Sequence, residues 1–213
     1  MFARGNNRCR IFLDDVDHTT YLGMLGYVVR ARGWHCLGYC LMDNHVHLLI
    51  ETPEPNLGAG MGNLHGLYAQ DFNVRRGRSG HLFQGRFGSA LMRSDEQLWH
   101  TAAYIARNPV ASDLCRRPEQ WRWSSYRPTV EGDAPDWLAV ERLLGYFGRA
   151  GGCPRARYVE AVNGHRDPPL ARRTRQPIVQ TANRRTGGAE NEPQFGCKRQ
   201  TRREVGTQSQ RSP

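Results

Sequence analysis

Two histidines separated by one residue, His45 and His47, are the strongest chemical signal in the 213-residue sequence. Residues 45–51 are expected to form a strand, and because side chains alternate between the two faces of a strand, both imidazoles point to one face. The opposite face would carry Val46, Leu48 and Ile50. Two imidazole nitrogens that converge on one site predict a bound divalent metal ion with open coordination positions, as a catalytic metal requires.

A tyrosine and an asparagine four residues apart, Tyr104 and Asn108, offer the groups that such a site lacks. Residues at this spacing share one face of a helix, so a phenol nucleophile and an amide oxygen as third ligand would arrive together. Asn108 precedes Pro109, which predicts that the helix stops there and that Tyr104 lies in its last turn. Tyr68 is a rival nucleophile, but it falls in an apolar stripe typical of the core or of a base-stacking platform.

The formal net charge of +10 suggests a polyanionic partner. Residues 165–213 hold 11 Lys and Arg against 4 Asp and Glu, so most of the excess lies in this tail. The segment His81–Arg86 mixes aromatic, amide and basic side chains, which suits base stacking and phosphate contact. The predicted nucleic-acid contacts are Arg75, Arg76, Arg78, His81, Gln84, Arg86 and Arg107.

Local patterns predict the elements that must position these residues. The turn Asp43-Asn44 joins two expected strands, Trp34–Met42 and His45–Glu51, into a β-hairpin. Helical spacing and capping residues predict helices from Asp14 to Gly33, from Leu57 to Phe72, from Ser94 to Pro109 and from Trp137 to Phe147. Alternation predicts a further strand over His81–Met92. The sum is an α+β domain.

Composition divides the chain into three parts. Residues 1–130 contain the motifs, 131–164 are an expected helical extension, and 165–213 lack the apolar residues for a core and are expected to be disordered. No run approaches the roughly 18 apolar residues of a membrane span, and no signal peptide is recognisable at the start, so we expect a cytoplasmic protein without a membrane partner. The six cysteines lack C-x-x-C spacing, which argues against a zinc module.

Five motifs in order carry a resemblance to a known family. They are Arg4-Gly5-Asn6, Met42-Asp43-Asn44-His45-Val46-His47-Leu48-Leu49, Gly80-His81-Leu82-Phe83-Gln84-Gly85-Arg86-Phe87, Tyr104-Ile105-Ala106-Arg107-Asn108-Pro109-Val110 and Trp123-Ser124-Ser125-Tyr126. From about Arg4 to Tyr126 the sequence resembles the REP-associated tyrosine transposases, a branch of the insertion-sequence-type single-tyrosine transposases of the HUH superfamily.

The resemblance implies a ferredoxin-like antiparallel sheet with helices, Mg²⁺ or Mn²⁺ as cofactor, and usually a dimer. It implies single-stranded DNA with hairpin or palindromic ends as substrate. His45 and His47 match the metal ligands of the family, Asn108 its third-ligand position and Tyr104 its nucleophile. The implied reaction is cleavage and rejoining of DNA through a 5′-phosphotyrosine intermediate.

The start of the chain departs from the family pattern. Family members place a longer strand before the segment that matches Arg4-Gly5-Asn6, whereas only Met1-Phe2-Ala3 precede it here. We therefore expect the first strand of the sheet to be truncated. Three alternative functions follow: an inactive nucleic-acid-binding remnant, a host-domesticated processor of repeated palindromes, and a metal-dependent hydrolase in which water attacks in place of Tyr104.

Overall fold

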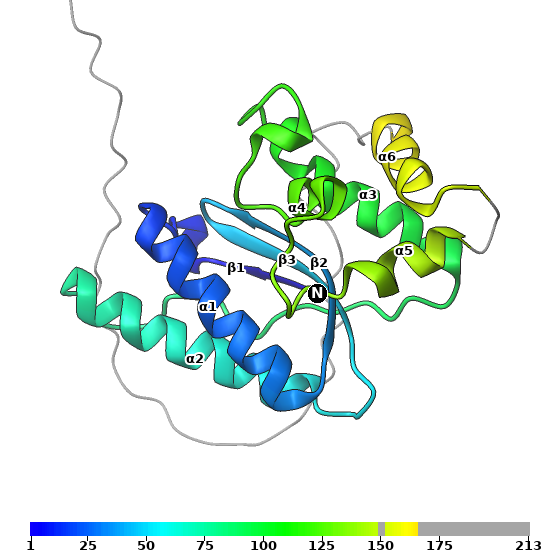
Figure 1. The fold of residues 1–213 in the computed structure, drawn as a ribbon. Helices are drawn as coiled ribbons and strands as arrows, with labels where there is room; N and C mark the ends of the chain where they lie inside the picture. Colours follow the sequence, from blue (N-terminus) through cyan, green and yellow to red (C-terminus); the bar gives the residue numbers. More distant parts are fainter. Residues whose placement is uncertain (149–151, 166–213) are drawn as a thin grey trace, which may run out of the picture. The chain divides into compact units, whose positions relative to one another are not determined.

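Strand β3 (His45–Glu51), which carries both histidines, lies at the centre of a three-stranded antiparallel sheet in the computed structural model (Figure 1). Its neighbours are β1 (Phe2–Arg4) and β2 (His35–Met42). Residues 43 and 44 form the predicted turn between β2 and β3. The structure describes residues 1–148 and 152–165, so the predicted tail, apart from His165, lies outside the described residues.

The first strand of the sheet, expected to be truncated, is present as the three-residue strand β1. Phe2, Ala3 and Arg4 pair with His47, Val46 and His45 respectively. The 3-10 turn η1 (Asn6–Arg8) follows directly. Gly5 is needed at this junction because a side-chain carbon there would lie 2.2 Å from the carbonyl oxygen of Cys9.

The predicted strand His81–Met92 is wrong as a continuous element. Instead, this segment runs along the outer edge of β1 and pairs with it through two isolated β-bridges, Phe2 with Gly88 and Gly5 with Phe83. Backbone bonds from Gln84 N to Arg4 O (2.9 Å) and from Gly88 N to Phe2 O (2.8 Å) support them. The segment between the bridges is longer than the stretch of β1 that it faces, so it bulges out of strand geometry.

Helices α1 (Asp15–Arg32) and α2 (Leu57–Arg76) pack on one face of the sheet, against Val46 and Leu48 (Figure 1). The Asp14 carboxylate caps α1 by accepting from Asp17 N at 3.0 Å, and Gly33 ends the helix in the left-handed conformation. Both helices were predicted from their apolar stripes.

The other face of the sheet, which carries the two histidines, is covered by α3 (Asp95–Ala111), α5 (Val140–Gly148) and α6 (Pro154–Gly164). Ser94 caps α3 by accepting from Gln97 N at 3.2 Å, as its capping-box pattern predicts. The predicted stop at Pro109 is wrong: α3 continues to Ala111, and Tyr104 lies well inside it. Pro109 removes one backbone N–H and its hydrogen bond to the preceding turn, and α3 ends two residues later, at Ala111.

The outer edge of β2 is covered by the Trp123-Ser124-Ser125-Tyr126 motif. Leu41 N donates to Trp123 O and Ser125 N donates to Tyr39 O, both at 2.9 Å. The flanking elements are η2 (Pro118–Gln120) and α4 (Tyr126–Glu131).

The topology confirms the predicted α+β, ferredoxin-like class. The order along the chain is strand, helix, two strands, helix, and then the strand-like segment 82–88 beside β1. Residues 131–164, predicted as a helical extension, supply α5 and α6, whose apolar residues join those of α3 in one core cluster.

Candidate functional site

Three predicted site residues meet on the sheet face that α3 covers. The imidazoles of His45 and His47 are perpendicular, with centroids 5.0 Å apart. The phenol ring of Tyr104 meets the His47 ring edge to face, with centroids 5.5 Å apart. His47 is 7 % exposed. The structure therefore brings the nucleophile candidate directly against the histidine pair.

The backbone of the hairpin fixes the direction of both imidazoles. Alternation along β3 sends Val46 and Leu48 to the α1–α2 core and leaves both histidines facing α3, as the sequence predicts. His45 Nδ1 lies 2.6 Å from Asn44 Oδ1. An amide oxygen accepts from a protonated Nδ1, and in this tautomer Nε2 keeps the lone pair that would bind a metal ion.

Asn108 is buried inside α3, one turn after Tyr104, with 1 % exposure. Its Nδ2 donates to the carbonyl oxygen of Tyr104 at 3.0 Å. Because this bond commits the NH₂ group, Oδ1 is the atom of this amide that can act as a ligand. Pro109 does not turn Asn108 out of the helix, so the shared face predicted for Tyr104 and Asn108 is present.

The donor set fits a divalent cation. Two imidazoles of fixed orientation and an amide oxygen are ligands that divalent metals accept, and open positions remain for substrate oxygens. Within residues 1–148 and 152–165, no cluster of three His, Cys, Asp or Glu side chains is placed to hold a metal. The third ligand expected from the sequence, the Asn108 amide, is of a type outside that group.

Arg4 and Phe2 complete the surroundings of the histidine pair, and neither was among the predicted site residues. The Phe2 ring lies 5.5 Å from the His45 ring and 5.0 Å from the His47 ring. The Arg4 guanidinium lies over the Phe2 ring at 5.1 Å. The Arg4-Gly5-Asn6 motif was the available signal, but the sequence did not predict the pairing that places Arg4 beside His45.

His165, at the end of α6, is a second residue that the sequence did not indicate. Its ring centroid lies 6.3 Å from that of Tyr104 and 6.4 Å from that of His100. The sequence placed His165 at the start of the expected disordered tail, and no motif marks it. Only the packing of α6 on α3 brings this imidazole to the nucleophile candidate.

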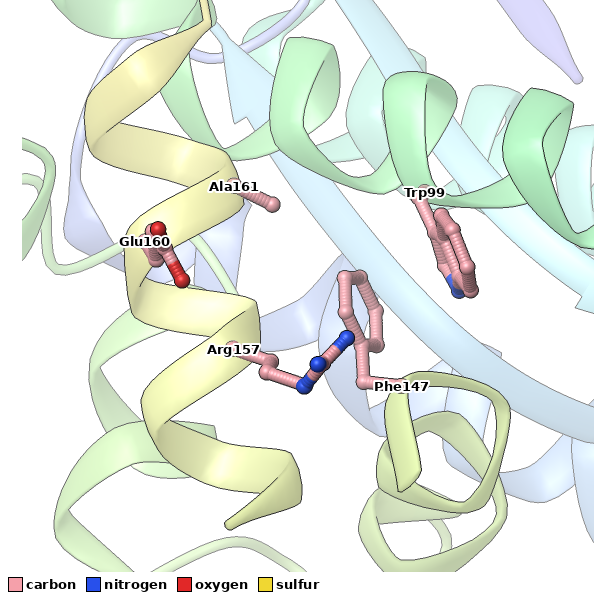
Figure 2. A pocket seen from close by; sticks show the side chains of 5 residues that line it. All are labelled: Trp99, Phe147, Arg157, Glu160 and Ala161. Atoms are coloured by element: carbon pink, nitrogen blue, oxygen red, sulfur yellow. The ribbon is translucent and has the colours of Figure 1, made fainter. Parts of the chain in front are cut away.

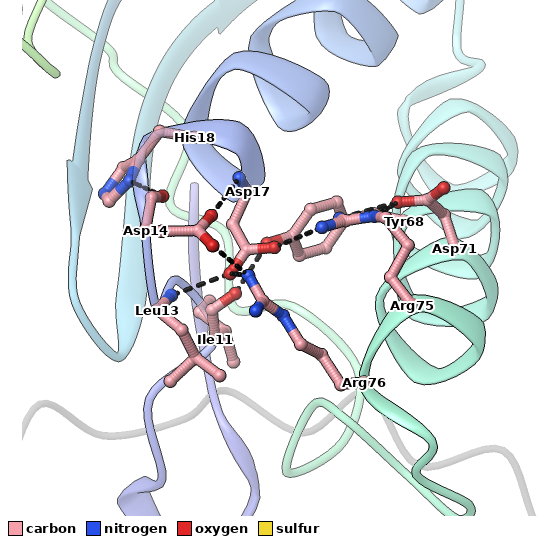
Figure 3. Close-up of polar contacts among 9 residues, drawn as sticks. All are labelled: Ile11, Leu13, Asp14, Asp17, His18, Tyr68, Asp71, Arg75 and Arg76. Carbon is pink, nitrogen blue, oxygen red and sulfur yellow. Dashed lines mark hydrogen bonds and ion pairs between the residues drawn. The ribbon is translucent and has the colours of Figure 1, made fainter.

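Arg75 and Arg76, two of the predicted DNA contacts, lie on the α1–α2 side and bind carboxylates (Figure 3). Arg75 pairs with Asp71 and with Asp17, both at 2.7 Å. Arg76 pairs with Asp17 at 2.9 Å and with Asp14 at 2.5 Å. These aspartates balance their charges. Because both arginines lie on the α1–α2 side of the sheet, they are not part of the Tyr104 site.

The remaining predicted DNA contacts are distributed over two regions. Arg78, His81, Gln84 and Arg86 are exposed, and the last three belong to the segment beside β1. The Arg78 guanidinium lies 5.7 Å from the Phe72 ring. Arg107 is half-buried on α3, one turn after Tyr104.

Tyr68, the rival nucleophile, lies in the core. It is fully buried and donates a hydrogen bond to Ile11 O at 2.5 Å. Burial raises the pKa of this phenol far above its ordinary value. A phenol without solvent access and with a high pKa is a poor nucleophile, so the geometry favours Tyr104.

A cavity of about 180 Å³ lies between α3, α5 and α6 (Figure 2). It is lined by Trp99, Phe147, Arg157, Glu160 and Ala161. None of the predicted site residues lines it. In the described residues, no helix has the length and apolar character needed to cross a membrane.

Known proteins resemble the chain over the part that forms this site. A REP-associated tyrosine transposase of Haemophilus influenzae is 26 % identical over 111 residues, which cover 46 % of this chain and 63 % of the relative. The chain thus matches less than two thirds of that relative's length. A solved structure of a REP-associated tyrosine transposase bound to a REP hairpin shares the fold, with a TM-score of 0.52 and 19 % identity over 63 % of this chain and 80 % of that one.

A family model described as IS200-like transposase matches residues 2–108. That span is half of the chain and includes His45, His47, Tyr104 and Asn108. The chain belongs to the IS200-like transposase family.

Proposed function

We propose that this protein cleaves and rejoins single-stranded, hairpin-ended DNA, with Tyr104 as the nucleophile. The observation that carries the proposal is the edge-to-face contact of Tyr104 with His47, beside His45 on one sheet face. Family membership supports a transposase reaction, and the structural relative was solved with a REP hairpin. The dimer implied by the sequence resemblance stays a prediction.

The chemistry follows from the phenol. Tyr104 Oη attacks the scissile phosphorus and loses its proton, while the bond from phosphorus to the 3′ oxygen breaks and that oxygen gains a proton. The products are a 5′-phosphotyrosine and a free 3′-hydroxyl. The phosphotyrosine retains the energy of the cleaved phosphodiester bond, so a second 3′-hydroxyl can displace Tyr104 and rejoin the strands without ATP.

The ligands proposed for the cofactor are His45 Nε2, an imidazole nitrogen of His47 and Asn108 Oδ1. A Mg²⁺ or Mn²⁺ ion held there would supply positive charge to the scissile phosphate and to the transition state. The protein's own residues fix the geometry: Asn44 sets the His45 tautomer, and α3 keeps Tyr104 against His47.

The test is covalent capture of DNA. Wild-type protein and the Tyr104→Phe variant are incubated with 3′-labelled, hairpin-ended single-stranded DNA and Mn²⁺, and then separated under denaturing conditions. We expect a labelled protein adduct with wild type and none with Tyr104→Phe. Tyr27→Phe is the matched control, because Tyr27 is 61 % exposed on α1 and should leave the adduct unchanged.

Each other outcome selects a different function. An adduct that persists in Tyr104→Phe would falsify the nucleophile assignment. Cleavage without any adduct would indicate a hydrolase in which water attacks. Binding without cleavage would indicate an inactive DNA-binding protein.

A further inference from the structure

Arg4 occupies the same sheet face as the two histidines. It pairs with His45 across the β1–β3 ladder, and paired residues project to the same side of a sheet. Its guanidinium lies over Phe2, whose ring in turn contacts both imidazoles. A fixed positive charge therefore stands beside the proposed metal ligands.

Arg4 differs from Arg75 and Arg76 in having no carboxylate partner. Its Nε is buried and has no hydrogen-bond partner, and in the described part of the chain no ion pair joins Arg4 to a carboxylate. Arg75 and Arg76, in contrast, each bind two aspartates. An unpaired, partly desolvated charge costs free energy, so a protein that keeps one gains from an anionic ligand.

The electrostatic surroundings of Arg4 point to the same conclusion. Burial lowers the pKa of its guanidinium, and the nearby charge of Arg8 lowers it further, whereas the Tyr104 phenolate acts in the opposite direction. Arg4 pairs with His45 on the sheet face where Tyr104 meets His47. An anion placed between Arg4 and Tyr104 would meet the guanidinium fork and the phenol oxygen together.

We propose that Arg4 is a catalytic residue that binds a non-bridging oxygen of the scissile phosphodiester and offsets the negative charge that develops there during attack by Tyr104. The inference rests on the proposed function and names a group that acts in addition to the metal. Arg4 takes no part in bond breaking. It binds the phosphate before, during and after formation of the phosphotyrosine.

The experiment compares charged and neutral scissile groups. Single-turnover rates of adduct formation are measured with Mn²⁺ for wild type, Arg4→Ala, Arg4→Lys and Arg10→Ala. One substrate has a normal scissile phosphodiester, and the other has a methylphosphonate there, which lacks the negative charge. Arg10 is the matched control because it is 57 % exposed and pairs with Asp43 at the surface.

On the normal substrate we expect Arg4→Ala to be slower by about 10²–10³-fold, the range found when a transition-state donor is removed. Arg4→Lys should recover part of the rate, because it keeps the charge but loses the planar fork. On the methylphosphonate, wild type and Arg4→Ala should react within a few-fold of each other. Arg10→Ala should match wild type on both substrates.

Three results overturn the inference. An equal loss for Arg4→Ala on both substrates would mean that Arg4 acts through the fold, which thermal melting of the variant would corroborate. A wild-type rate for Arg4→Ala on the phosphodiester would show that Arg4 does not assist attack on the scissile phosphate. Absence of an adduct with wild type on the phosphodiester would refute the proposed function itself. A wild-type adduct combined with either of the first two results would refute only the role of Arg4.

Discussion

Asn44 Oδ1 lies 2.6 Å from His45 Nδ1, and the Nδ2 of the same amide donates to Arg8 O at 3.1 Å. One side chain in the hairpin turn therefore links the first histidine of the pair to the turn that follows β1. Mutation of a group that orients a metal-binding histidine in this way typically weakens metal affinity by about 10–100-fold.

We predict that Asn44→Ala weakens Mn²⁺ binding by about 10–100-fold, because His45 loses the partner that sets its tautomer. Asn44→Asp is the informative comparison, since it keeps an oxygen acceptor and loses the bond to Arg8 O. It should bind Mn²⁺ about as tightly as wild type. Isothermal titration calorimetry measures both affinities. Equal affinity for Asn44→Ala and wild type would show that the Asn44 contact does not orient a ligand.

The hairpin and the helices could be predicted from sequence because their signals are local. The turn Asp43-Asn44, the alternation after His45 and the capping pattern at Ser94 each lie within a few residues of what they determine. The period of two along a strand places His45 and His47 on one face, and the helical period places Tyr104 and Asn108 on one face.

The position of β1 could not be predicted, because it depends on pairing between distant segments. Arg4 lies beside His45 through a ladder that joins residues some forty positions apart in the chain. His165 reaches Tyr104 only through the packing of α6 on α3. Neither relationship leaves a periodic signal in the sequence.

Composition also could not distinguish the two kinds of arginine. Arg75 and Arg76 were predicted as phosphate contacts together with Arg86 because the sequence shows only that each is an arginine. Their aspartate partners are supplied mainly by the start of α1, far away in sequence. An arginine is available to phosphate only where the fold leaves its charge without a carboxylate.

Gly5 should be required for the placement of Arg4. In Gly5→Ala the new carbon would lie 2.2 Å from Cys9 O and 2.8 Å from Ile11 Cγ2, so the backbone must shift, at a cost of about 1–3 kcal/mol. Gly62→Ala is the control: nothing lies within 4 Å of that site on α2, and alanine should stabilise the helix by about 0.5–1 kcal/mol. Urea unfolding measures both changes, and a neutral Gly5→Ala would contradict the close approach.

Asp17 should contribute far more to stability than its neighbour Asp15. Its side chain is fully buried and accepts from Leu13 N (2.8 Å), Arg75 and Arg76 (Figure 3). Asp17→Ala leaves two guanidinium groups without this partner, so we expect a loss of about 3–5 kcal/mol in unfolding free energy.

Asp15→Ala is the comparison for Asp17. Asp15 pairs with Arg122, but the two side chains are 66 % and 64 % exposed, and exposed pairs contribute at most about 1 kcal/mol. Chemical denaturation of both variants gives the difference. Similar losses for the two would mean that the Asp17 network does not hold α1 to α2.

His65 should make the fold sensitive to acid. Burial lowers the pKa of its imidazole to about 4, and the ring contacts the Tyr21 hydroxyl at 3.2 Å and stacks on Phe83 at 4.2 Å. The unfolded chain takes up the proton near the ordinary histidine pKa of about 6.5, whereas the folded chain resists protonation until about 4. The stability that this histidine contributes is therefore complete above pH 6.5 and is lost as the pH falls toward 4.

The His65→Gln variant separates this effect from other titrations. Glutamine can still accept from Tyr21 but takes up no proton, so the variant should be less stable than wild type by a nearly constant amount near neutral pH. Between pH 7 and pH 4.5, wild type should lose about 2–3 kcal/mol more than the variant. Urea unfolding at both pH values measures the two losses, and His18, whose pKa burial also lowers, is common to both proteins. Parallel losses would mean that His65 becomes protonated in the folded state at its ordinary pKa, and that its burial between Tyr21 and Phe83 does not exclude water.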